Sequence, residues 1–254
     1  MLESRGLTLK YEQHIVVKDF SFAVQPHTIT TIIGPNGCGK STLLKALSKN
    51  KKIASGEVLI EDQSITTYSH KALAKKLAIL PQSPLVPDDF SVRDLVSYGR
   101  NPYLDWMGRL KEEDYRITDW AIRETGIAHL QHRKMSTMSG GERQSAWIAM
   151  ALTQQPELLL LDEPTTYLDI AHQHEVLKLI QKINGEMGIT VIMVLHDINQ
   201  ASRYSDHIII MKEGKKMVEG TPKEVITQET FRDIFSIDVT IYNKEHSYPY
   251  FIVR

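Results

Sequence analysis

The chain has 254 residues, 42% of them hydrophobic, with 30 lysines and arginines against 31 aspartates and glutamates. A chain of this length buries about 70–75% of its unfolded surface, so it needs no disulfide or structural metal to fold. The neutral charge balance excludes a global field that recruits nucleic acid or anionic lipid. A single cysteine, Cys38, excludes an internal disulfide and favours a reducing compartment.

The N-terminus lacks an apolar signal segment, and the longest apolar runs fall far short of the ~20 residues of a membrane span. We therefore expect a soluble, cytoplasmic-type globular protein. Residues 7–24 alternate apolar and polar side chains, which predicts half-buried antiparallel strands with Phe20, Phe22 and Val24 on one face. A β-branched run at 28–33 predicts a strand that ends at a glycine turn.

Lysines dominate residues 49–52, the densest basic run of the chain. Short charge runs of this kind usually form solvated loops, so we expect a loop here rather than a binding patch.

Three continuous apolar runs predict buried strands of a parallel sheet, at 78–80, 158–161 and 190–195. Between the last two, Val176, Ile180 and Ile183 recur at helical spacing, and we expect that helix to end at Gly185. Strand–helix–strand repetition predicts an α/β fold, mostly parallel, with an antiparallel N-terminal part.

A helical subdomain is expected within this core, at residues 83–155. Prolines border it on both sides, and helices are expected at 94–99, 112–125 and 141–153. We predict one domain, 1–254, in which 1–82 and 156–220 form the core and 221–254 a C-terminal extension. In the extension, we expect a helix near 224–235 and an edge strand after Pro249.

The strongest motif lies between the strand at 28–33 and a helix expected at 42–48. It matches the phosphate-binding loop G-x-x-x-x-G-K-[ST], and its residues are Gly34, Pro35, Asn36, Gly37, Cys38, Gly39, Lys40 and Ser41, followed by Thr42. Backbone N–H groups of such a loop and the helix N-terminus bind phosphate oxygens. Lys40 is expected to reach the β- and γ-phosphates, and the Ser41 hydroxyl to bind Mg²⁺. Cys38 is either a reactive thiol, since helix N-termini lower thiol pKa values, or a small residue that fits the loop.

A nucleoside triphosphatase needs a second set of groups, and the apolar strand at 158–161 supplies it. Asp162 and Glu163 follow this strand directly. Asp162 is expected to hold Mg²⁺ through water, and Glu163 to polarise the attacking water.

At Met138, Ser139, Gly140, Gly141 and Glu142 the sequence resembles the LSGGQ motif of ATP-binding-cassette (ABC) ATPases. Other motifs of that family occur in the family's order. Tyr11 resembles the aromatic residue that stacks on adenine, Gln82 the Q-loop glutamine that also binds Mg²⁺, Asp169 the D-loop aspartate and His196 the switch histidine. The resemblance implies ATP and Mg²⁺ as cofactors, with Glu163, His196 and Gln82 as catalytic residues.

The LSGGQ-like motif would provide a second anion-binding helix N-terminus in the same chain. If two chains pair head-to-tail, the phosphate-binding loop of one chain and the LSGGQ-like motif of the other can bind the same ATP. The residues of the motif that would contact the partner's ATP are Ser139, Gly140, Gly141 and Glu142. We therefore expect a homodimer. Glu142 stands where the family usually has glutamine, and adds a negative charge if it points into the site.

A narrower resemblance, to the ATPases of iron(III)–siderophore importers, lies in residues 98–103, 146–152 and 164–173. It implies separate permease subunits that dock near residues 83–110, an extracytoplasmic binding protein, no nucleic-acid partner, and a peripheral place on the cytoplasmic face of the membrane. Cobalamin, haem or another metal chelate is the alternative substrate. A soluble ATP-gated dimerising module, and a cassette acting on DNA or ribosomes, are the less favoured functions.

Several further residues invite a functional interpretation. His172 and His174 lie two apart on a predicted helix, so they diverge and are expected to be surface histidines. His129 and His132 could share a face, but no third ligand is evident. Trp106 and Met107 are either docking anchors for the permease or ordinary, partly buried residues.

Overall fold

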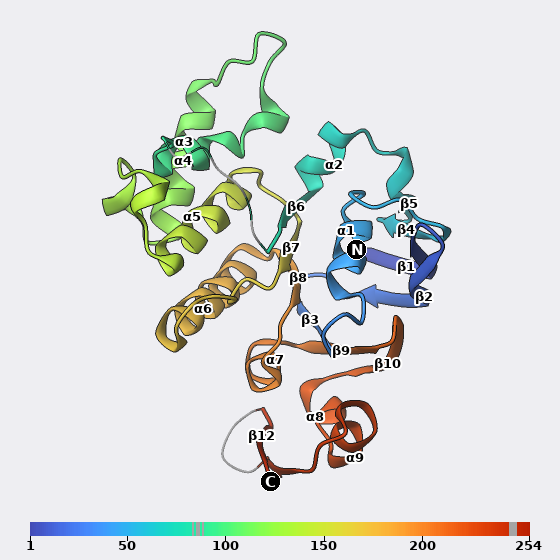
Figure 1. The fold of residues 1–254 in the computed structure, drawn as a ribbon. Coiled ribbons are helices and arrows are strands. Elements are labelled where there is room, and N and C mark those ends of the chain that lie inside the picture. Colours follow the sequence, from blue (N-terminus) through green and yellow to red (C-terminus); the bar gives the residue numbers. More distant parts are fainter. Residues whose placement is uncertain (83, 85–86, 88, 244–247) are drawn as a thin grey trace. The chain divides into compact units, whose positions relative to one another are not determined.

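The computed structural model describes residues 1–82, 84, 87, 89–243 and 248–254. The chain forms two compact units, one made of 1–67 and 190–254 and the other of 68–189. Figure 1 shows that both combine helices with strands, which confirms the predicted α/β fold. The finer division into core, helical subdomain and extension remains a prediction.

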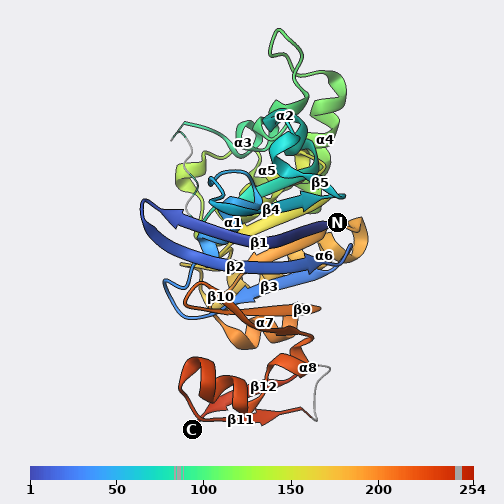
Figure 2. The same ribbon diagram turned by 90° about the vertical axis from the view of Figure 1, so that its right-hand side faces the viewer.

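The first unit contains an antiparallel sheet in the order β2-β1-β4-β5. Its strands are β1 (Leu2–Tyr11), β2 (His14–Val24), β4 (Ser55–Ile60) and β5 (Gln63–Ser64), followed by a 3₁₀ helix, η1 (Ile65–Thr67). Phe20, Phe22 and Val24 are buried on one face of β2, as their alternation predicts. The two long strands lie side by side in Figure 2, and their pairing confirms the predicted N-terminal strands.

The first unit also contains three strands that pair in parallel and one that joins them antiparallel. β3 (Ile29–Ile33) pairs in parallel with β8 (Thr190–Val194) and β9 (His207–Lys212), and β10 (Lys215–Gly220) is antiparallel to β9. Every residue of β3 and β8 is buried, which explains their unbroken apolar and β-branched composition. The strands β4, β9 and β10 were not predicted, although the isoleucine run in β9 is typical of a buried strand.

Two helices of the first unit matter for function. α1 (Lys40–Leu47) starts directly after the glycine-rich loop and contacts β1 and β2. α7 (Ile198–Tyr204) follows β8, and the Asp197 carboxylate caps its start by accepting a hydrogen bond from the Gln200 N–H at 3.0 Å. The amide of Asn199 bonds both the N–H and the carbonyl of Phe251, at 3.0 and 3.2 Å, and so ties α7 to the last strand.

The C-terminal segment departs from the single helix expected near 224–235. It contains α8 (Pro222–Val225), α9 (Gln228–Thr230) and a π-helical turn, η5 (Phe231–Phe235), and then β11 (Val239–Tyr242) and β12 (Tyr250–Val253). Thr227 has extended backbone and caps α9 by accepting from the Thr230 N–H, so the helix restarts there. The edge strand expected after Pro249 is present as β12, which pairs with β11 in a two-stranded sheet.

The second unit contains β6 (Leu77–Leu80), which pairs in parallel with β7 (Leu158–Asp162). Its helices are α2 (His70–Lys76), α3 (Val92–Tyr98), α4 (Glu112–Glu124), α5 (Gly140–Thr153) and α6 (Ile170–Met187). Three 3₁₀ turns connect them, at η2 (Asn101–Tyr103), η3 (Ala128–Leu130) and η4 (Met135–Thr137). α3, α4 and α5 pack on one another, which confirms the three helices expected in this segment (Figure 1).

The predicted end of the helix at Gly185 was wrong. α6 continues through Gly185 to Met187, and Gly188 ends it with left-handed backbone (φ 67°) and an N–H bond to the carbonyl of Asn184 at 2.9 Å. A glycine inside a helix costs only about 1 kcal/mol. The position that permits the left-handed cap therefore ends the helix, rather than the first glycine met along it.

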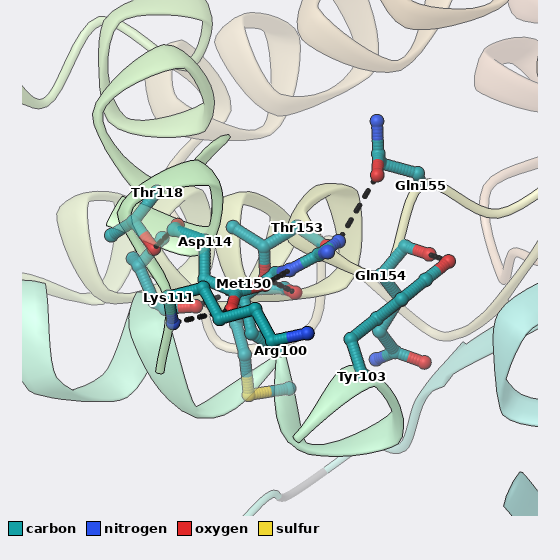
Figure 3. Close-up of polar contacts among 10 residues, drawn as sticks. Arg100, Tyr103, Lys111, Asp114, Thr118, Met150, Thr153, Gln154 and Gln155 are labelled. Atoms are coloured by element: carbon teal, nitrogen blue, oxygen red, sulfur yellow. Dashed lines mark hydrogen bonds and ion pairs between the residues drawn. The ribbon is translucent and has the colours of Figure 1, made fainter. Parts of the chain in front are cut away.

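A buried ion pair links the segment after α3 to α4 and α5 (Figure 3). Arg100 Nε lies 2.8 Å from Asp114 Oδ1, and both side chains are about 95% buried, with 4% and 5% exposed. The guanidinium also donates to the carbonyl of Thr153 at the end of α5, and it stacks on the Tyr103 ring, 3.7 Å from the centroid. Burial raises the pKa of Asp114, but the Lys111 N–H and the Arg100 guanidinium outweigh it, so the pKa is lowered.

In the part of the chain that the structure describes, no helix combines the length and apolar character needed to cross a membrane.

Candidate functional site

Two glycines shape the predicted phosphate-binding loop between β3 and α1. Gly34 and Gly39 have φ values of 152° and 106°, which side-chain-bearing residues rarely adopt. A Cβ at position 34 would lie 2.0 Å from the carbonyl oxygen of Met211, and one at 39 would lie 2.9 Å from that of Val16. The loop can therefore curl against its neighbours only with glycine at these two positions.

Lys40, the first residue of α1, is buried, with 5% of its surface exposed. Its ammonium donates to the carbonyls of Gly34 and Pro35, at 2.9 and 3.1 Å, and so lies within the loop. The N-terminus of α1 adds backbone N–H groups and partial positive charge at the same place. This donor set of one ammonium and several N–H groups suits a polyphosphate anion.

Cys38 is buried, and burial raises the pKa of its thiol despite the nearby Lys40. A raised pKa keeps the thiol protonated and unreactive. Of the two interpretations of Cys38, this favours the small residue that fits the loop.

Two further predicted residues lie in the first unit. Tyr11 ends β1 opposite His14, and 46% of its surface is exposed. His196 is exposed, directly after Leu195 and before the α7 cap. The other predicted site residues belong to the second unit.

Glu163 follows β7 with left-handed backbone (φ 54°), which a non-glycine residue adopts only at a cost. Its Oε2 accepts hydrogen bonds from Nε2 of Gln82 and, at 3.0 Å, from Oγ1 of Thr166. The structure thus brings together two predicted catalytic residues far apart in sequence. Asp162, the last residue of β7, is buried, with 5% exposed.

Thr166 was not among the predicted site residues. It lies three residues after Glu163 in a turn closed by its N–H, which donates to the Glu163 carbonyl at 3.2 Å. A hydroxyl at that spacing after a strand-ending glutamate is the signal that could have identified it.

The LSGGQ-like motif forms the start of α5. Ser139 is the N-cap: its hydroxyl accepts from the Glu142 N–H, and the Glu142 carboxylate accepts from the Ser139 N–H at 2.8 Å. This capping box lowers the pKa of Glu142. The charge that replaces the family's glutamine is thus bonded to the helix start of its own chain.

Gly141 lies against the start of α6. A Cβ at this position would be 2.3 Å from Cδ2 of His172. His172 in turn is bonded to the predicted D-loop residue: its N–H donates to Asp169 Oδ1, and its Nδ1 lies 2.9 Å from Asp169 Oδ2. Because the two helix starts approach closely, any side chain at position 141 would displace the His172 ring.

We expect the imidazole of His172 to titrate above the ordinary value of about 6.5, because its hydrogen bond and charge attraction to Asp169 raise its pKa. The stabilisation from this raised pKa is complete below about pH 6.5 and disappears as the pH rises through the folded-state value. An NMR titration of the histidine resonances measures the pKa. Asp169→Asn should lower the pKa of His172 and leave the titrations of the other histidines unchanged. An unchanged His172 pKa would contradict the assignment.

The remaining residues that invited a functional interpretation are at least partly exposed to solvent. Trp106 is 90% exposed and Met107 48% exposed, so ordinary partial burial does not describe Trp106. His129 and His132 are exposed. Among the described residues, no three His, Cys, Asp or Glu side chains are grouped so that they could hold a metal ion.

A glycine loop that encloses a lysine at a helix N-terminus, and a parallel strand ending in Asp-Glu, define the phosphate-loop class of nucleoside triphosphatases. The family model described as ABC transporter matches residues 17–166. The chain belongs to the ABC transporter family and is one of its ATP-binding ATPases, as the resemblance predicts.

Relatives of known name are similar over almost the whole chain. The iron(3+)-hydroxamate import ATP-binding protein FhuC of Bacillus subtilis is 47% identical, over 94% of this chain and 89% of its own length. The petrobactin import ATP-binding protein FpuC of Bacillus anthracis is 43% identical, over 99% and 92%. Among solved structures, an inward-facing metal-chelate type ABC transporter matches with a TM-score of 0.87 and 26% identity, over 100% and 96% of the two chains. ATPases of this family dimerise and work with membrane permease subunits.

Proposed function

We propose that this chain hydrolyses ATP to power the uptake of iron(III)–siderophore complexes through a separate membrane permease. The observation that carries the proposal is the buried Lys40 ammonium, held inside a glycine loop at the N-terminus of α1. The names of the two relatives, which concern import of an iron(III)-hydroxamate and of petrobactin, support the substrate class.

The loop residues, 34–42, would bind the phosphates of ATP, and Tyr11 would stack on the adenine. Glu163 would accept a proton from the attacking water, a role supported by the two hydrogen bonds that fix its carboxylate. Gln82 and His196 complete the proposed catalytic residues.

A magnesium ion would be held by oxygen atoms of Ser41 and Gln82 and, through water, by the Asp162 carboxylate; oxygen atoms are the hard ligands it prefers. When bound, it supplies positive charge to the phosphate oxygens. Hydroxyl, amide and carboxylate oxygens fit this ion, whereas the sulfur of Cys38 does not.

The active form would be a head-to-tail homodimer. Ser139, Gly140 and Gly141 would contact the ATP of the second chain through the N-terminus of α5, with Asp169 at the same interface. Glu142, predicted to bind there too, would act by capping that helix start. The dimer would lie on the cytoplasmic face of the membrane, with the permease docked near residues 83–110 and an extracytoplasmic binding protein in the complex. Cobalamin, haem or another metal chelate is the alternative substrate.

The test is uptake by cells in which Glu163→Gln replaces the resident copy. Labelled hydroxamate and catecholate siderophores are followed beside cobalamin and haem, and Glu157→Gln at the other end of β7 is the matched control. We expect siderophore uptake to collapse in the Glu163→Gln cells alone, with equal protein levels, while cobalamin and haem still enter. Normal siderophore uptake with loss of another compound would show that the substrate class is wrong and leave the ATPase role standing.

A further inference from the structure

Lys51, in the basic run expected to be a solvated loop, lies on the face of Tyr11. Its Nζ is 3.3 Å from the centroid of the Tyr11 ring, well within the range of a cation–π contact. The ring is otherwise half-exposed at the end of β1. One of its two faces is therefore covered by an ammonium group.

The backbone on both sides of Lys51 is anchored. The Asn50 N–H donates to the Lys45 carbonyl of α1 at 2.8 Å, and its side-chain amide donates to Ser48 Oγ at 3.1 Å. Further along, the Ala54 N–H donates to the carbonyl of Thr8 in β1 at 2.9 Å. Lys51 is thus fixed between α1 and the strand that carries Tyr11.

The two ends of α1 separate the ammonium from the phosphate-binding loop. The loop precedes Lys40 at the N-terminal end of this helix, which is about 12 Å long, and Lys51 lies beyond its C-terminal end at Leu47. Because the ammonium covers one face of the Tyr11 ring, the opposite face remains for the base of a nucleotide whose phosphates lie in the loop.

We propose that Lys51 is a positioning residue for nucleotide binding: it covers one face of Tyr11 and holds the ring so that a purine stacks on the opposite face. This rests on the proposed role of Tyr11 in ATP binding. A cation over one face also draws ring electron density towards itself, which favours stacking of an aromatic base on the other. Lys51 has no direct bond to the nucleotide in this proposal.

The test compares ATP with inorganic tripolyphosphate, which carries phosphates but no base, by competition against a fluorescent nucleotide. Lys51→Met should weaken ATP binding about 2–5-fold, the size of an exposed cation–π contact, and leave tripolyphosphate binding unchanged. Lys51→Arg should restore ATP affinity, because a guanidinium also stacks on an aromatic ring. Lys52→Met, the same change at the exposed neighbour, is the control and should alter neither affinity.

Three outcomes would overturn the inference. Equal loss for ATP and tripolyphosphate would mean that Lys51 acts only through its charge on phosphates. Unchanged or tighter ATP binding in Lys51→Met would mean that the ammonium is idle or competes with the base. The third outcome is a further loss of ATP affinity when Lys51→Met is added to Tyr11→Ala. Because the proposed effect of Lys51 depends on the ring, Lys51→Met should have no effect once the ring is removed. If Tyr11→Ala alone leaves ATP affinity intact, the proposed adenine contact fails first, and that result is distinct from a failure at Lys51.

Discussion

Replacing Glu163 by glutamine is expected to lower the kcat of ATP hydrolysis by about 10²–10⁴-fold. The amide has the same shape but cannot accept a proton from water, whereas the bonds from Gln82 and Thr166 hold the carboxylate in one orientation. Steady-state phosphate release measures kcat, and equilibrium binding of ATP measures affinity. We expect affinity to be retained, because the loop at 34–42 is unchanged.

The control is Glu157→Gln, which makes the same chemical change just before β7. Glu157 is an exposed carboxylate paired with Lys76 at 3.2 Å. Because surface ion pairs contribute little, the Glu157→Gln variant should keep a kcat within about twofold of the wild-type value. If Glu163→Gln kept a rate close to that of this control, Glu163 would not be the catalytic base.

The second large effect is on stability. Arg100→Met should destabilise the protein by about 3–5 kcal/mol, because it leaves Asp114 buried without its cation. For a chain of this size that corresponds to a fall in melting temperature of about 6–20 °C. Thermal unfolding followed by circular dichroism measures it at constant nucleotide concentration.

A matched control lies on α4, the helix that carries Asp114. Arg116 pairs with Glu112 at 3.6 Å, with both side chains more than three-quarters exposed, so Arg116→Met should have almost no effect. Adding Asp114→Leu to Arg100→Met should recover part of the loss, since it removes the unpaired charge. Equal stability of the Arg100 and Arg116 variants would contradict a structural role for the buried pair.

The pH dependence of this pair has a definite sign. The pKa of Asp114 is lowered in the folded protein, so the stability it contributes is complete above about pH 4. It is lost as the pH falls through the folded-state pKa. The difference in melting temperature between wild type and the Arg100→Met/Asp114→Leu variant should therefore shrink at the acid end of a pH series.

Local sequence pattern determined much of the fold. The alternation in residues 7–24, the β-branched run at 28–33 and the apolar runs at 158–161 and 190–195 each predicted a strand that is present. The loop at 34–41 was identified because its residues and its place between strand and helix are both local features. Ser139 and Glu142, three apart, contained the signal of the capping box that the structure shows.

Local sequence signals did not predict correctly where two of the helices end. Gly185 resembled a helix end, but only Gly188 has the left-handed cap. The expected helix near 224–235 is broken at Thr227, where burial of Phe231 against Phe251 depends on a strand far along the chain. Such long-range packing overrides a local propensity of a few tenths of a kcal/mol per residue.

For the site, the sequence by itself predicted which residues carry the chemistry: Lys40, Glu163, Gln82 and the LSGGQ-like motif. Only the tertiary structure decided their partners. It brought Gln82 into a hydrogen bond with Glu163, placed His172 against Gly141, and placed Lys51, within the predicted loop, over the Tyr11 ring. The reason is physical: spacing and composition specify the elements within one strand or helix, whereas a hydrogen bond or ring contact between distant residues exists only after those elements pack.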